Sequence, residues 1–388
     1  MRIKSFDFVA CLLLLALHTA CSTSLPAVTP TPLVSPTHTQ YPTRAITPPP
    51  LDFQLIQIPA PSLEGSLLDE PTEQPAQIYL PPSYNHSERR YPVVYFLPGF
   101  GSSTEGEEEY FPAAQLAAWM ANDQLKEMIL VVPNGGNLLH GSFYVNSSVT
   151  GNWEDFIVKD VVGFIDSNYR TLAIAGGRGI GGFSMGGFGA INLAMRFPDT
   201  FSAAYLLSAG LFDENGLADS QMFNTVNKIT AFLDVMAELK AMPKQEAIRK
   251  MGKYDGALGL TMAYGAAFAP KPQQDAPFFD YPYEQKGADL ERIPQVWKRW
   301  ENGLGGWKQK VKQYHDHLSS LRGILIDYAK YDGNTWIPRG SEFLAKQLAA
   351  TGVPFKLYNY PGDHGDRLEE RLLTVMLPFF DQVLEDPH

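Results

Sequence analysis

A serine flanked by glycines has the clearest chemical meaning in this chain. Ser184 lies in the segment 182–187, Gly-Phe-Ser-Met-Gly-Gly, directly after a short apolar run and directly before residues with helical spacing. A Gly-x-Ser-x-Gly sequence in this context is typical of a sharp strand-to-helix turn that exposes a nucleophile. The backbone of such a turn is strained, and Gly182, Gly186 and Gly187 provide neighbours without a Cβ. We therefore predict that Ser184 is a nucleophile.

A serine nucleophile needs a base, and the base needs an acid that orients it. Two residues follow Ser184 in the chain order serine, acid, histidine. Asp332 begins a glycine-containing loop after the apolar run 323–328, and His364 lies in a glycine-rich loop after the run 355–358. Parallel sheets place their sites at the carboxyl ends of strands, where both loops are expected. The predicted catalytic set is Ser184, Asp332 and His364.

Other residues compete for these roles. Asp327 lies inside a predicted strand rather than past its end, and Asp363, next to the histidine, is expected to face solvent. Asp332 itself has a simpler interpretation, the start of a turn with the glycine that follows it. Of the eight histidines, His364 alone combines the required chain order with a glycine-rich loop. His140 lies in a loop near the predicted site and is a candidate substrate contact.

The negative charge that develops during acyl transfer needs two backbone N–H donors. One is expected from Met185, the residue after the nucleophile. The other is expected from Phe100 in the Pro-Gly-Phe-Gly loop 98–101, which follows an apolar strand. A plain glycine turn is the alternative interpretation of this loop.

Five apolar runs, separated by segments with helical patterns, predict the fold class. Runs without polar alternation are typical of strands buried on both faces, so we predict an α/β protein with a mainly parallel sheet and helices on both sides. The runs cover residues 77–80, 92–97, 128–132, 203–207 and 323–328.

Composition narrows the function classes. The 388 residues are 45% hydrophobic and 19% charged, which is typical of a globular protein with a large core. A formal charge of −11 argues against a nucleic-acid partner, because phosphate binding needs a basic face. The only cysteines are Cys11 and Cys21, so no disulfide framework or cysteine-based metal site is predicted. No metal and no cofactor are expected.

The N-terminus has the pattern of an export signal. Arg2 and Lys4 form a short basic region, and residues 8–17 are an apolar run too short to span a bilayer. The sequence Leu-His-Thr-Ala-Cys that ends at Cys21 resembles a bacterial lipobox, in which the cysteine becomes the lipidated first residue. His18 stands where this pattern prefers Leu or Val, so a plain signal peptide is the alternative.

We therefore predict a lipoprotein signal peptide over residues 1–20 and a Pro/Thr-rich tether over 21–50. The folded domain is expected over 51–388, with an insertion at about 212–320. We therefore expect a protein of the bacterial cell surface or periplasm that is attached to the membrane through its N-terminal lipid alone. A secreted protein is the alternative.

Taken together, these motifs resemble the esterase D-type family of α/β-hydrolases, which includes feruloyl esterases, S-formylglutathione hydrolase and the mycolyltransferases. The resemblance covers about residues 77–380. It implies an α/β-hydrolase fold, the triad and oxyanion donors above, and substrate contacts from Gly99, Tyr144, His140 and Trp153. Family members usually have His-Gly where this chain has Pro-Gly at Gly99.

The insertion at 212–320 is longer than is usual in this family and is expected to form a helical cap. It contains an amphipathic pattern over 229–239 and an aromatic-rich stretch, 277–283. These aromatic residues either pack the cap onto the domain or line an acyl or sugar subsite.

The sequence thus predicts a serine esterase that hydrolyses a carboxylic ester, with small-molecule or glycan esters as substrates. Two alternatives stay open. An acyltransferase would use the same triad, and a glycan-binding protein would keep the scaffold without catalysis.

Overall fold

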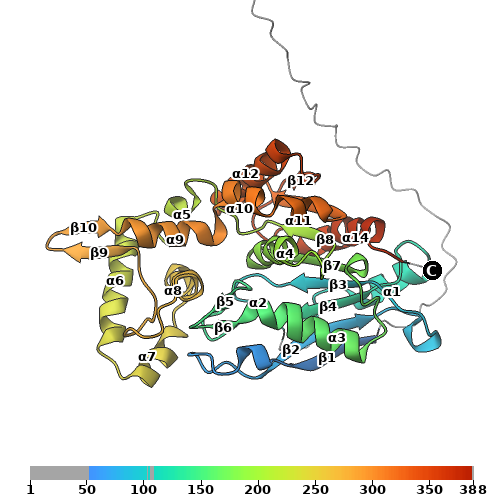
Figure 1. The fold of residues 1–388 in the computed structure, drawn as a ribbon, viewed down its shortest axis with the longest axis horizontal. Helices are drawn as coiled ribbons and strands as arrows, with labels where there is room; N and C mark the ends of the chain where they lie inside the picture. Colours follow the sequence, from blue (N-terminus) through green and yellow to red (C-terminus); the bar gives the residue numbers. More distant parts are fainter. Residues whose placement is uncertain (1–51, 103, 105–108, 387–388) are drawn as a thin grey trace, which may run out of the picture. The chain divides into compact units, whose positions relative to one another are not determined.

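An eight-stranded sheet is the centre of the structure. The computed structural model describes residues 52–386, without 103 and 105–108 (Figure 1). The strand order is β1-β2-β4-β3-β7-β8-β11-β12. β1 and β2 form the antiparallel edge, and every pairing from β4 to β12 is parallel. The strands are β1 (Asp52–Pro59), β2 (Glu73–Leu80), β3 (Val93–Leu97), β4 (Ile129–Pro133), β7 (Arg178–Phe183), β8 (Ala203–Leu207), β11 (Gly323–Ala329) and β12 (Lys356–Tyr360).

Both faces of the sheet are covered, as the unbroken apolar runs predict. In β3, Val93, Tyr95 and Leu97 belong to one hydrophobic cluster, while Val94 and Phe96 belong to the other. This alternation follows from the two-residue period of a strand. The predicted mainly parallel α/β sheet is confirmed.

Helices from distant parts of the chain form the outer layers. The face that carries Tyr95 packs against α3 (Val162–Asn168), α4 (Met185–Arg196) and α12 (Trp336–Thr351). The opposite face packs against α1 (Ala113–Ala121) and α14 (Leu377–Val383). Shorter elements complete the core: β5 (Asn146–Ser147), β6 (Gly151–Asn152), α2 (Trp153–Asp155), the π-helical turns Phe156–Val161 and Leu372–Met376, and α13 (Leu368–Arg371).

The insertion between β8 and β11 is mainly helical, as expected, and it also contains a two-stranded hairpin (Figure 1). The predicted amphipathic pattern forms α6, which buries Ile229, Phe232 and Leu239. We refer to this insertion as the cap. Its elements are α5 (Gly216–Asp219), α6 (Val226–Lys240), α7 (Lys244–Met251), α8 (Gly256–Phe268), β9 (Tyr283–Lys286), β10 (Asp289–Arg292), α9 (Pro294–Leu304), α10 (Trp307–Gln313) and α11 (His315–Ser320).

The predicted signal peptide, Cys21 and the tether at 21–50 lie outside the described residues. Within the described part of the chain, no helix combines the length and the apolar character needed to cross a bilayer.

Candidate active site

Ser184 occupies a tight turn between β7 and α4. Its φ of 55° and ψ of −114° are strained for a residue with a side chain. Hydrogen bonds hold the strained backbone: the Ser184 N–H donates to Leu207 O at 2.9 Å, and the Ser184 carbonyl accepts from Gly210 N at 2.8 Å. The half-buried side chain is therefore presented at the carboxyl end of the sheet.

Glycines permit the close approach of the two sides of this turn. A Cβ on Gly182 would overlap the backbone of Gly186, and a Cβ on Gly186 would overlap the carbonyl oxygen of Leu97. In the sheet register, Leu97 pairs with Gly182 and Gly182 pairs with Leu206. The ends of β3, β7 and β8 are therefore level, and the loops that follow them meet.

The structure brings Ser184, His364 and Asp332 together. His364 Nε2 lies 3.0 Å from Ser184 Oγ, and His364 Nδ1 lies 2.6 Å from Asp332 Oδ2. The Asp332 side chain is fully buried, and its other oxygen accepts from the N–H of Asn334 at 2.7 Å. The imidazole also lies against the ring of Phe183, with 4.8 Å between ring centres. These contacts fix both the carboxylate and the plane of the imidazole.

The competing aspartates have other partners. Asp327 is buried within β11, where it binds Arg371 through two hydrogen bonds of 2.8 and 3.0 Å and accepts from the Tyr205 hydroxyl. Asp363 is exposed, and its carboxylate accepts from the backbone N–H of Gly333. The hydrogen bonds of the His364 ring go to Asp332 and Ser184 and not to either of these carboxylates.

The predicted oxyanion donors flank the serine. Met185 begins α4, so its N–H lies in the first turn, where helices lack internal acceptors. Phe100 follows Gly99, which approaches Ser184 so closely that a Cβ there would lie 3.5 Å from the serine Cβ. Neither N–H, of Phe100 or of Met185, donates to an acceptor among the described residues. Both donors are available to a bound ligand.

A cavity of about 380 Å³ opens above Ser184 and His364. Its walls are mainly apolar and come from the core loops, the cap and the start of α12. The polar groups Gln221 and Asn334 also line it, and Gln221 accepts from the indole N–H of Trp336 at 3.2 Å. The apolar lining residues are Phe100, Phe143, Met185, Phe212, Met222, Leu260, Tyr264, Leu304, Trp336 and Ile337.

Of the residues expected to contact substrate, Gly99 lies beside Ser184, but Tyr144 and Trp153 do not line the cavity. Both of these aromatic side chains are fully buried. The Tyr144 hydroxyl donates to Pro98 O, and the Trp153 indole donates to Thr150 O, both at 2.8 Å. The structure therefore gives these two side chains supporting positions rather than substrate contacts.

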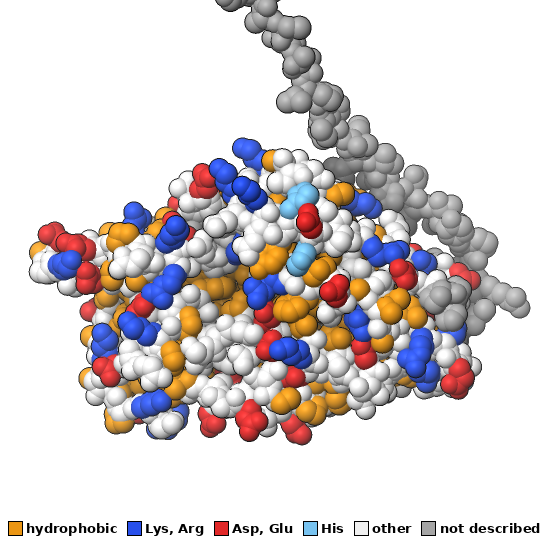
Figure 2. Space-filling model, viewed as in Figure 1, with side chains coloured by type: hydrophobic (Ala, Val, Ile, Leu, Met, Phe, Trp, Pro, Cys, Tyr) orange, Lys and Arg blue, Asp and Glu red, His pale blue; other side chains and the backbone are white. Residues whose placement is uncertain are grey.

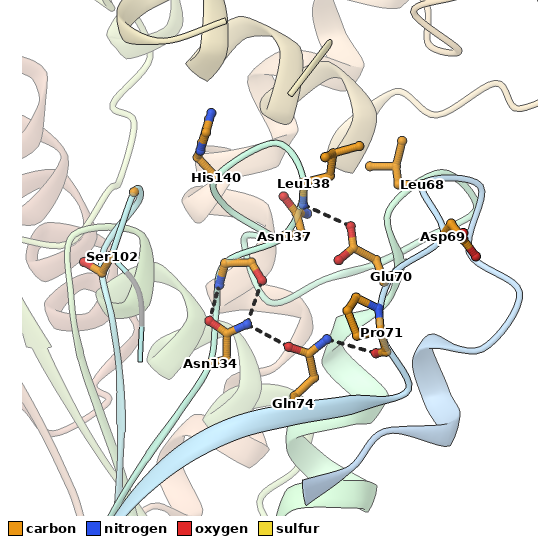
Figure 3. A pocket seen from close by; sticks show the side chains of 12 residues that line it. Leu68, Asp69, Glu70, Pro71, Gln74, Ser102, Asn134, Asn137, Leu138 and His140 are labelled. Atoms are coloured by element: carbon orange, nitrogen blue, oxygen red, sulfur yellow. Dashed lines mark hydrogen bonds between the residues drawn. The ribbon is translucent and has the colours of Figure 1, made fainter. Parts of the chain in front are cut away.

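His140 is exposed, but it borders a different cavity, of about 370 Å³ (Figure 3). This second cavity is lined by Glu70, Gln74 and Asn134 among others, and Ser184 does not border it. Figure 3 shows His140 on the opposite side of the cavity from the linked amides of Asn134 and Gln74. The carbonyl oxygen of His140 accepts a hydrogen bond from Gly101 N, in the 98–101 loop, at 2.9 Å.

The aromatic residues of the cap mainly pack on one another. Phe223 contacts the rings of Tyr281, Tyr283, Trp297 and Trp300 at 5.3 to 5.8 Å between centres. None of these five lines the cavity above Ser184. The packing interpretation of the aromatic-rich stretch therefore holds for these residues.

Apart from Phe100, Met185, Ser184 and His364, the residues that line the cavity were not predicted from the sequence. Tyr264, Gln221 and Trp336 come from segments with no motif, and only tertiary folding brings them to Ser184. Among the described residues, no group of three or more His, Cys, Asp or Glu side chains is arranged to hold a metal ion.

The fold and the Ser184 turn define the α/β-hydrolase class. A solved structure titled ferulic acid esterase matches with a TM-score of 0.56 and 18% identity, over 86% of this chain and 98% of that chain. An esterase family model described as "Putative esterase" matches residues 71–310, and the chain belongs to this family. The expected membership of an esterase family is confirmed.

Two curated relatives are similar over shorter regions. Esterase Rv1288 of Mycobacterium tuberculosis (strain H37Rv) is 36% identical over 132 residues, which is 33% of this chain and 27% of the relative. An endo-1,4-beta-xylanase/feruloyl esterase of Xylanibacter ruminicola is 27% identical over 157 residues, 38% of this chain and 21% of the relative. The matched regions thus span about a quarter of each relative's length.

Proposed function

We propose that this protein is a serine esterase that hydrolyses a carboxylic ester through an acyl-enzyme. The observation that carries the proposal is the hydrogen-bonded path from Asp332 through His364 to Ser184, at the base of a largely apolar cavity. Membership of an esterase family supports the same reaction class.

In this mechanism, Ser184 Oγ attacks the ester carbonyl while His364 Nε2 takes its proton. Asp332 accepts a hydrogen bond from His364 Nδ1–H and stabilises the imidazolium that forms. The N–H groups of Phe100 and Met185 bind the negatively charged oxygen of the tetrahedral intermediate. His364 then protonates the leaving alcohol, and a water molecule, activated by the same histidine, hydrolyses the acyl-enzyme.

The cavity favours an apolar acyl group of substantial size. Its aromatic walls, including Phe143, Tyr264 and Trp336, match a bulky or aromatic acyl chain better than acetate alone. An acylated carbohydrate is the substrate class we propose, and the relative named as an endo-1,4-beta-xylanase/feruloyl esterase supports this choice.

The test compares wild type with Ser184→Ala on p-nitrophenyl esters. Ser320→Ala, at an exposed serine on α11, serves as the matched control. We expect hydrolysis by wild type and by the Ser320 variant, and a loss of roughly a thousandfold or more in Ser184→Ala. Equal turnover in all three proteins would contradict the proposal. A folded wild type without turnover on any ester would favour the glycan-binding alternative.

We also propose that the protein is an exported lipoprotein attached through Cys21. The basic start, the short apolar run and the lipobox-like sequence support this proposal. In a bacterial host, the full-length chain should partition into detergent with the membranes, and Cys21→Ala should not. If both proteins are soluble with the same processed mass, the protein is secreted without a lipid.

A further inference from the structure

A third cavity, of about 220 Å³, lies between α4 and the α9–α10 turn of the cap. Asn192 and Arg196 line it from α4, and Asn302 and Lys310 line it from the cap. Ser184 does not border this cavity, so it is distinct from the active site. Figure 2 shows this face hollowed beside α4, with hydrophobic side chains along the hollow and basic side chains at its edge.

The residues of α4 that line this cavity are spaced four apart in the sequence. Phe188, Asn192 and Arg196 therefore lie on one face of the helix. The residue Asn192 is only 7% exposed, and it lines the cavity. The amide atoms of Asn192 are not among the buried unpaired side-chain atoms of the described residues, so they are accessible to a ligand in the cavity.

Lys310 brings a positive charge to the same cavity. Its ammonium donates to Gly303 O at 2.8 Å and lies 4.8 Å from the ring centre of Trp307. Within the described residues, Lys310 pairs with no carboxylate. Burial, together with the charge of Arg196, lowers its pKa to about 7. In its protonated form, Lys310 thus has unused donors and a charge that no carboxylate compensates.

The other charges of the cavity already balance. Arg196 binds Glu154 through two contacts, Nε to Oε2 at 2.8 Å and Nη2 to Oε1 at 2.9 Å. This pairing leaves the charge of Lys310 as the excess. A cationic ligand would be repelled by the unpaired charge of Lys310, and a neutral ligand would leave that charge uncompensated.

We propose that this cavity binds a small oxyanion, either a carboxylate or a tetrahedral anion such as phosphate or sulfate. Such an anion accepts hydrogen bonds from the Lys310 ammonium and from the side-chain amides of Asn192 and Asn302. It also neutralises the charge that burial penalises. Asn192 lies about 12 Å along α4 from Ser184, from the helical rise per residue. The bound anion therefore links the cap to the helix that carries the nucleophile, whatever reaction Ser184 performs.

Isothermal titration calorimetry on the full-length protein tests this proposal. Phosphate, sulfate and acetate are each titrated at a constant ionic strength set with sodium chloride. We expect saturable binding of at least one of them to wild type. Binding of phosphate or sulfate without acetate would identify a tetrahedral anion as the ligand, and binding of acetate alone would identify a carboxylate. Binding of all three would support an oxyanion site that accepts both.

Substitutions of residues that line the cavity test whether the anion binds there. Lys310→Met should abolish binding, and Lys308→Met, at an exposed lysine on the same helix, should not. Because Lys310→Met removes a buried charge, it should unfold at the same temperature as wild type or higher. Asn192→Ala keeps every charge and should weaken binding roughly tenfold, which corresponds to one lost hydrogen bond. No saturable binding of any of the three anions to wild type, or unchanged binding by Lys310→Met, would overturn the proposal.

Discussion

The hydroxyl group of Tyr144 donates a 2.8 Å hydrogen bond to the carbonyl oxygen of Pro98. Pro98 precedes Gly99 and Phe100, so this bond anchors the loop that carries one proposed oxyanion donor. Burial raises the pKa of Tyr144 well above its usual value, which keeps the phenol protonated and able to donate. A Cβ on Gly135 would overlap this hydroxyl, so a glycine is needed where the ring passes. Tyr144 is thus a positioning residue beneath the active site.

Replacing Tyr144 by Phe should lower turnover while leaving KM nearly unchanged. The variant leaves the buried Pro98 carbonyl without its donor, which should cost about 1–3 kcal/mol of unfolding free energy. Misplacement of the Phe100 N–H should reduce kcat roughly tenfold. Tyr79→Phe, at a buried tyrosine on the other face of the sheet, is the control and should lose stability without losing turnover. Wild-type kcat in Tyr144→Phe would show that the bond does not position the loop.

Substitution by asparagine should have different effects at the two buried aspartates: it should lower kcat at one and destabilise the fold at the other. Asp332→Asn should fold normally and lose roughly a thousandfold or more in kcat, because the amide no longer stabilises the imidazolium. Asp327→Asn should instead destabilise the fold by about 3–5 kcal/mol, because it leaves Arg371 without its buried partner. Urea unfolding and steady-state kinetics on both variants separate these effects. Comparable kcat losses in two equally stable variants would refute the assignment.

The cavity wall formed by α8 should limit the size of the acyl group that the enzyme accepts. Leu260→Trp should fill the cavity, and kcat/KM for a hydroxycinnamate ester should fall at least about tenfold relative to that for an acetate ester. Leu258→Trp, two residues earlier on α8 and outside this cavity, is the matched control. If both variants keep the wild-type ratio of kcat/KM values, the acyl group lies elsewhere.

Glu70 should make the stability of the fold depend on pH. Burial raises its pKa to about 7, partly offset by the N–H of Leu138, which donates to its carboxylate at 3.1 Å. Between its usual value of 4.5 and about 7, the folded state binds a proton that the unfolded state does not, so stability falls as pH rises through this window. The shift corresponds to a loss on the order of 3 kcal/mol.

Glu70→Gln should remove this loss. Unfolding free energies measured by urea denaturation at about pH 5 and pH 8 should differ less in Glu70→Gln than in wild type. Glu73→Gln, at an exposed glutamate on β2, should behave as wild type. An unchanged pH dependence in Glu70→Gln would contradict the role of Glu70.

Local signals explain why the fold and the reacting side chains were predictable. The apolar runs correspond to buried strands because their residues pack on both faces of the sheet, as in β3. The glycines around Ser184 are required by contacts within a few residues of the turn, and His364 follows in a glycine-rich loop. In each case the structural feature depends on residues that are close together in the sequence, so a local pattern predicts it.

The walls of the site depend instead on contacts between distant segments. Trp336 meets Gln221 across 115 residues, and no local pattern marks either residue as part of a cavity. Tyr144 and Trp153 illustrate the converse: their motifs indicate proximity to the site, but they do not tell a lining side chain from a buried support. Burial of this kind is decided by tertiary packing.

Mass spectrometry of a trapped acyl-enzyme tests directly whether Ser184 is the nucleophile. Wild type is incubated with a slowly hydrolysed aryl ester, quenched in acid and digested. We expect the mass of one acyl group to be added to the peptide that contains Ser184, and we expect Ser184→Ala to acquire none. An acyl group on a different residue, or steady ester hydrolysis by Ser184→Ala at the wild-type rate, would contradict this role of Ser184.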